Sequence, residues 1–184
     1  MAKYSEGIWT ELHNLIPSEK DLIARFKVAP FGPTFMGAAD ILRKRGYLDE
    51  CIIILDEGLR KCPHFHSARA ALGRDYYLKG LMTEALAELE IVTKRTPDNL
   101  MAQRFHLRLA ILFEDRDAAQ KKLDILKKMG KDDEIVNTIR ENLQLGSLDG
   151  ARRVIIAELA NLGIPGNWET DIAHKDTDLP ARLK

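Results

Sequence analysis

The sequence predicts an all-α protein that is built from antiparallel pairs of helices. Three observations lead to this fold class. Sequence positions recur about every 34 residues, as at Pro63 and Pro97. Apolar residues lie at helical spacing on both sides of Arg45-Gly46-Tyr47, which is typical of two helices joined by a short turn. Signals for β-strands are almost absent from the chain.

The composition is that of a folded domain, with 45% hydrophobic and 30% charged residues among 184. The 28 Lys and Arg residues balance the 28 Asp and Glu residues, and this zero net charge argues against a dedicated nucleic-acid binder. No stretch approaches the roughly 20 consecutive apolar residues of a membrane-spanning helix, and the first 20 residues do not resemble a signal peptide. With only two cysteines, we expect a cytoplasmic protein that interacts with no membrane.

The first elements predicted along the chain are two helices, at residues 5–14 and 18–28, separated at Pro17. Ser18 is the candidate N-cap of the second helix. These helices belong to an N-terminal region, residues 1–31, which we expect to dock on the first helix pair.

The period divides residues 32–131 into three helix pairs, at 32–65, 66–99 and 100–131. A proline such as Pro63 ends the second helix of a pair, because it lacks an N–H group and clashes with the preceding turn. One pair cannot bury its apolar face alone, whereas stacked pairs share a continuous core. We therefore expect the pairs to stack.

The middle copy carries a specific motif. It reads Leu72-Gly73-x-x-Tyr76, then Ala85-x-x-x-Leu89, then Pro97. This order resembles the tetratricopeptide repeat (TPR), whose pattern is W-x-x-L-G-x-x-Y, then A-x-x-x-F, then P. The Trp and Phe positions differ, and hold Arg69 and Leu89 here. The resemblance implies a right-handed superhelical solenoid of antiparallel helix pairs, in which Gly73 and Ala85 let two helices approach closely.

The neighbouring copies match the repeat less well. The first copy has Phe35 at the Trp position and Ala38-Ala39 in place of Leu-Gly. The third copy keeps Ala119 but has Lys131 in place of the proline. The resemblance thus covers residues 32–131, with its clearest motif in the middle.

Residues 132–163 are predicted to form a degenerate fourth repeat or a capping pair, with helices at 132–145 and 148–162. The helical pattern stops there, so residues 164–184 are predicted to be a mobile tail. Trp168 is the one anchor in this tail. It is expected to pack on the last helix, and contact with a partner is the alternative.

The motifs of common enzymes are missing, among them phosphate-binding and dinucleotide-binding loops, zinc-protease motifs and the nucleophile elbow. We therefore predict no catalytic activity and no cofactor. Three metal-competent side chains lie between Cys62 and His66, but a structural zinc site usually needs four ligands in separated pairs. We interpret this segment as a turn between repeats, and stoichiometric zinc would overturn that interpretation. His106 and Cys51 are interpreted as packed residues.

In the tetratricopeptide-repeat family, the first helices of successive pairs line a concave groove. The resemblance assigns this groove to Met36, Asp40, Arg43, Lys44, Ala70, Arg74, Tyr77, Leu78, Arg104, Arg108, Ile111 and Leu112. Five of these residues are basic and only Asp40 is acidic. Because guanidinium groups can hold carboxylates bidentately, the pattern predicts a partner segment rich in Asp or Glu. Solvated or internally paired charges are the alternative interpretation.

These features predict a non-catalytic adaptor or scaffold that binds a protein or peptide partner. A self-assembling structural subunit is one alternative, and binding of an anionic ligand or nucleic acid by the same arginines is another. Nucleic acid is less favoured, because Tyr77 is the only aromatic ring in the predicted groove. The carboxylate clamp of chaperone-binding repeats is not expected, since Met36 and Asp40 stand where that clamp needs Lys or Asn. The oligomeric state stays open.

Overall fold

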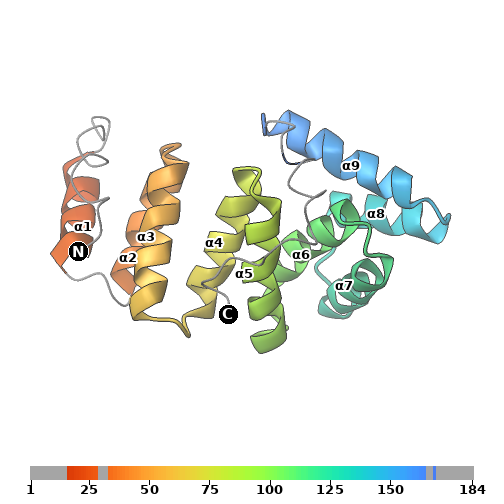
Figure 1. Ribbon diagram of the computed structural model, residues 1–184, viewed down its shortest axis with the longest axis horizontal. Coiled ribbons are helices and arrows are strands. Elements are labelled where there is room, and N and C mark those ends of the chain that lie inside the picture. Colours follow the sequence, from red (N-terminus) through yellow and green to blue (C-terminus); the bar gives the residue numbers. More distant parts are fainter. Residues whose placement is uncertain (1–15, 29–32, 165–167, 169–184) are drawn as a thin grey trace. The chain divides into compact units, whose positions relative to one another are not determined.

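A computed structural model describes residues 16–28, 33–164 and 168 of the chain (Figure 1). These residues form helices and turns without any strand, which confirms the predicted all-α class. In chain order the helices are α1 (Pro17–Val28), α2 (Pro33–Lys44), α3 (Leu48–Lys61), α4 (His66–Leu78), α5 (Met82–Arg95), α6 (Leu100–Leu112), α7 (Arg116–Met129), α8 (Glu134–Gln144) and α9 (Leu148–Asn161). None of the helices in this described part is long and apolar enough to cross a membrane.

The helix expected at residues 18–28 is present as α1, but the predicted N-cap is wrong. The helix begins at Pro17, so Ser18 lies inside its first turn. Proline suits this position because the first N–H groups of a helix have no partner within it. The side chain of Glu19 accepts a hydrogen bond from the Ile16 N–H at 3.0 Å and so caps the helix end. The helix expected at 5–14 lies outside the described residues.

The chain divides into two compact units, with the boundary between Ala68 and Arg69. In the first unit, α2 packs on both α1 and α3. Phe35 of α2 is fully buried and meets Phe65 edge to face, with the ring centroids 5.5 Å apart. Gly58 of α3 makes room for the Phe35 ring, because a Cβ at that position would collide with it.

Each helix pair turns back through a residue with positive φ. The angle is 84° at Gly46, 82° at Gly80 and 77° at Gly146, a conformation that glycine adopts at little cost. Glu114 takes the corresponding place between α6 and α7, with φ of 59°. Sequence reasoning could not foresee this turn, because the third copy lacks the glycine that marks the others.

In the second unit, the motif of the middle repeat forms the contact between α4 and α5. Leu72, Tyr76, Ala85 and Leu89 are all buried. A Cβ added at Gly73 would lie 2.7 Å from Leu89 Cγ and 3.4 Å from the Ala85 carbonyl oxygen. The close approach predicted for Gly73 and Ala85 is therefore present.

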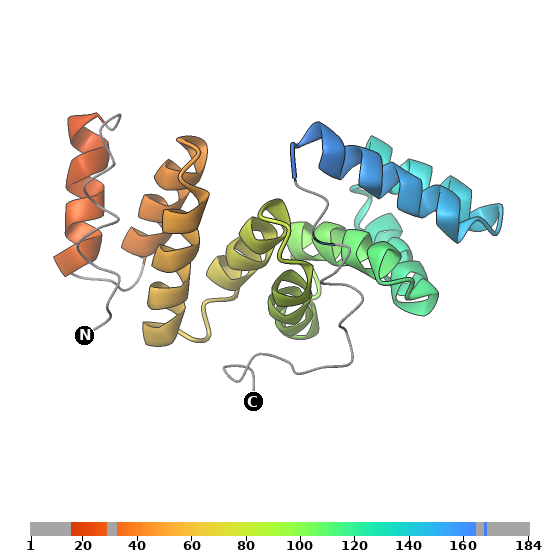
Figure 2. The ribbon, with the colours of Figure 1, turned by 45° about the horizontal axis from the view of Figure 1, so that its top comes forward.

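Helix α6 is the most enclosed element of the second unit, since it packs against α5, α7 and α9. The last helix, α9, lies against α6 as well as against α8 (Figure 2). The bounds of α8 and α9 agree with the helices expected after residue 131. Of the expected tail, only Ile164 and Trp168 are described, and both are buried.

Candidate functional site

The residues assigned to the groove by the resemblance lie on α2 in the first unit and on α4 and α6 in the second. On α2, Asp40 binds both basic residues of the predicted groove. Its carboxylate forms an ion pair with Arg43 and a second one, at 2.7 Å, with Lys44 Nζ. The hydrogen bond from Lys44, followed by that from Arg43, lowers the pKa of Asp40 against the opposing effect of burial. Met36 lies on the same helix and is half-buried.

On α4, two of the four assigned residues are inside the protein. Ala70 and Tyr77 are fully buried, so the prediction that they contact a partner is wrong for this conformation. Leu78 is half-buried. Arg74 Nε donates to the buried Asp75 carboxylate at 2.7 Å, and its Nη1 lies 3.7 Å from the sulfur of Met101.

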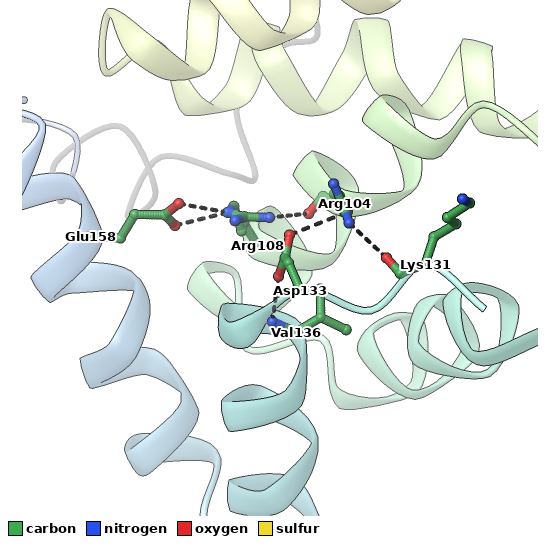
Figure 3. A network of polar contacts seen from close by, with 6 residues as sticks. All are labelled: Arg104, Arg108, Lys131, Asp133, Val136 and Glu158. Atoms are coloured by element: carbon green, nitrogen blue, oxygen red, sulfur yellow. Dashed lines mark hydrogen bonds and ion pairs between the residues drawn. The ribbon is translucent and has the colours of Figure 1, made fainter. Parts of the chain in front are cut away.

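On α6, Arg108 is buried against α9. Its Nε lies 2.8 and 3.1 Å from the two carboxylate oxygens of Glu158, and its Nη1 donates to the Arg104 carbonyl at 3.2 Å (Figure 3). The guanidinium also stands over the Phe105 ring, 5.5 Å from the centroid. Burial alone would lower the pKa of Arg108, but the hydrogen bond and charge of Glu158, with smaller effects of Tyr77 and Asp133, raise it. The expectation that Arg108 faces a partner is therefore corrected.

Arg104 is bound to the start of α8. Its Nε lies 3.2 Å from Asp133 Oδ2, and its Nη2 donates to the Lys131 carbonyl at 2.7 Å (Figure 3). Asp133 is also the N-cap of α8, since its side chain accepts from the Val136 N–H at 2.8 Å. One carboxylate thus fixes both the helix end and the arginine.

The buried Tyr77 hydroxyl lies near Glu158 but forms no hydrogen bond of ordinary geometry with a described residue. Burial, followed by the charge of Glu158, raises the pKa of this phenol. The ring meets Phe105 edge to face, with centroids 5.1 Å apart. Ile111 and Leu112 are fully buried as well, so their expected place on the groove surface is also corrected.

All five basic residues of the predicted groove have a carboxylate partner in the chain itself. They are Arg43, Lys44, Arg74, Arg104 and Arg108. Because Asp40 pairs with both Arg43 and Lys44, four carboxylates stand against these five cations, and most of the basic surplus that predicted an acidic partner in the groove is offset within the chain. Of the two interpretations open from the sequence, internal pairing is the one found.

The remaining candidate residues are structural. Cys62 ends α3, and its N–H donates to the Gly58 carbonyl at 2.8 Å. In the described part of the chain, no three His, Cys, Asp or Glu side chains are grouped so that they could hold a metal ion. His106 is buried, as predicted, with its Nδ1 3.1 Å from the Thr93 hydroxyl. Burial, with a smaller effect of Lys122, lowers the pKa of His106 to about 4.

Sequence reasoning missed a group of lysines on α7 and just after it. Lys121, Lys127, Lys128 and Lys131 are exposed, and Lys122 is half-buried. None of these five forms an ion pair with another described residue, since every salt bridge found there involves other cations. The signal was present in the segment KKLDILKKMGK, in which the apolar residues are spaced to face inward. We call these five residues the α7 lysine face.

Comparisons with known proteins do not indicate what the α7 lysine face binds. No family model matches the chain, and neither does any curated protein or solved structure. The paired arginines and the α7 lysine face are therefore the observations from which a function is inferred.

Proposed function

We propose that this chain is a non-catalytic interaction module, an adaptor or scaffold of the tetratricopeptide-repeat kind, that binds a protein carrying an acidic segment. The recurrence of helix pairs carries this proposal. Their first helices begin at Pro33, His66, Leu100 and Glu134, close to the period of the sequence. In this proposal the pairs belong to a right-handed solenoid, whose preformed helices bind a partner with little ordering cost.

Several buried polar side chains are paired with one another, which supports an interaction module that catalyses no reaction. In the second unit, Arg69 pairs with the buried Glu88 at 2.5 Å. Arg108 pairs with Glu158 at 2.8 Å, and His106 contacts Thr93. Such pairs satisfy buried groups and fix helix positions, which is the role expected of them in a scaffold.

Cations that have no ion-pair partner among the described residues support a partner that is acidic. The arginines of the predicted groove already hold carboxylates, so an acidic segment would have to displace Asp133 or Glu158 to reach them. The lysines of α7 have no such competitor among the described residues. A partner rich in Asp or Glu would therefore bind without breaking existing ion pairs.

Affinity capture from a nuclease-treated lysate of the source cells, with the full chain immobilised, tests the proposal. We expect a saturable protein partner that excess octaglutamate peptide releases and that binds in a fixed ratio in calorimetry. Light scattering across a range of concentrations is the companion measurement. If the molar mass of the particle rises with protein concentration and no other protein is captured, the chain is a self-assembling subunit instead. Capture from an untreated lysate that is absent from the nuclease-treated one would establish nucleic-acid binding.

A further inference from the structure

We propose that the α7 lysine face is the surface on which the acidic segment of the partner docks. This inference rests on the proposed function and replaces the concave groove as the binding surface. The occupant is a run of Asp and Glu residues in a partner protein, in extended conformation.

The local sequence builds this face onto a well-defined helix. Asp115 caps the start of α7 by accepting from the Ala118 N–H at 2.9 Å. Gly130 ends the helix in the left-handed conformation, with φ of 60°. Ala119, Leu123 and Leu126 are buried, so they hold one side of the helix against the protein. Lys121 and Lys128 consequently lie on the opposite side of the helix, Lys122 and Lys127 lie on its two flanks, and Lys131 follows its end.

These five lysines lie within eleven residues and are the largest group of unpaired cations along the second unit, where Arg95, Arg116 and Arg153 also form no ion pair with a described residue. Arg104, Arg108, Arg140 and Arg152 each lie within 3.2 Å of a carboxylate oxygen, whereas the five lysines have no such neighbour among the described residues. The acidic side chains of α7 itself do not change this. Asp124 accepts a hydrogen bond from Gln120 at 3.0 Å and forms no salt bridge with a described residue.

Lys122 of α7 is also repelled by other cations, Lys121 on the same helix and Lys94 at the end of α5. Burial lowers the pKa of Lys122, Glu90 opposes that effect, and the ammonium groups of Lys94 and Lys121 lower the pKa further. Glu90 is already paired with Lys94 at 3.2 Å. Carboxylates of a partner would relieve this repulsion, which gives the face a reason to prefer an acidic ligand.

The dimensions of the face suit a short extended segment. Seven residues separate Lys121 from Lys128, which corresponds to about 10 Å along the helix. An extended chain covers that length in about three to four residues. Nucleic acid fits less well, because α7 has no aromatic residue on which bases could stack.

The test titrates the full chain, labelled with ¹⁵N, with an octaglutamate peptide and, separately, with an oligothymidine of equal charge. The test variant is Lys121→Gln/Lys127→Gln/Lys128→Gln. The control, Lys20→Gln/Lys61→Gln/Arg153→Gln, removes the same charge from exposed positions elsewhere. We expect peptide-induced shifts to be concentrated on the amides of α7. The dissociation constant should rise about tenfold or more in the test variant and less than about twofold in the control.

Three results would overturn the inference, and they can be told apart. Equal losses in both variants would mean that only net charge matters. Peptide binding that shifts α2 or α6 and survives the α7 substitutions would return the site to the groove and leave the proposed function standing. Absence of any peptide binding, or tighter binding of the oligothymidine, would remove the acidic protein partner and with it the proposed function. Helical content measured by circular dichroism verifies that each variant is folded.

Discussion

Replacing Glu158 by Gln should destabilise the protein more than the same replacement at an exposed ion pair. The Arg108 side chain is 8% exposed and that of Glu158 is 18% exposed, so little water can take over the lost charge. Breaking a buried pair costs about 3–5 kcal/mol when one partner is removed. Because the Gln amide oxygen can still accept a hydrogen bond, we expect a loss of about 2–3 kcal/mol for Glu158→Gln.

The chain contains a matched control for this prediction. Glu114 also lies 2.8 Å from an arginine, Arg152, but these side chains are 59% and 30% exposed. Surface pairs of this kind are worth between zero and about 1 kcal/mol, so Glu114→Gln should cost less than about 1 kcal/mol. Both substitutions remove one negative charge and preserve the shape of the side chain.

Urea unfolding followed by circular dichroism at neutral pH measures the two free energies. The double variant Arg108→Met/Glu158→Leu adds a further check, because apolar groups of similar size often replace a buried pair with little loss. We expect this variant to recover most of the stability lost in Glu158→Gln. Equal costs for Glu158→Gln and Glu114→Gln would refute the conclusion that Arg108 is held inside the protein by Glu158.

Three further predictions concern other buried or strained positions. The pKa of His106 is about 4 in the folded protein and near 6.5 in the unfolded chain, so unfolded molecules take up the proton first as the pH falls. The stability should drop by about 3 kcal/mol between pH 6.5 and 4, and urea midpoints should show a smaller drop in His106→Gln. Gly73→Ala should lower the free energy of unfolding by about 1–3 kcal/mol, because the added methyl group collides with Leu89. In a chain that already carries Leu89→Ala, the same substitution should cost less. An unchanged melting temperature for Gly73→Ala would contradict this prediction. Gly46→Ala should lower the free energy of unfolding by about 1–2 kcal/mol in a denaturant titration, because φ at this position is 84°. The cost comes from the backbone alone, since nothing lies within 4 Å of the added methyl group. Equal stability of the variant would show that the turn adopts another conformation.

Much of the local fold could be predicted from the sequence because its signals are local. The spacing of apolar residues defines the helices, and Gly46, Gly80 and Gly146 mark turns that need positive φ. The contact between Gly73 and Leu89 follows from the repeat motif within one helix pair. Each of these features depends on residues that are close along the chain.

The candidate site could not be predicted in the same way, because its decisive contacts are distant in sequence. Glu158 lies 50 residues from Arg108, and it reaches that arginine only because α9 packs on α6. A count of charges on the first helices of the pairs leaves out Glu158, because that residue lies on α9. The pairs of Asp40 with Arg43 and Lys44 were within reach of sequence reasoning, since they follow the three- and four-residue spacing of a helix.

The central claim is that an acidic partner binds the lysines of α7 and not the predicted groove. Amine acetylation of the full chain, read by mass spectrometry with and without octaglutamate, tests it directly. We expect the peptide to slow acetylation at Lys121, Lys127 and Lys128, with no change at Lys44, which represents the groove, or at Lys61 of the first unit. Protection of Lys44 with unchanged rates on α7 would contradict the claim and restore the groove as the binding surface.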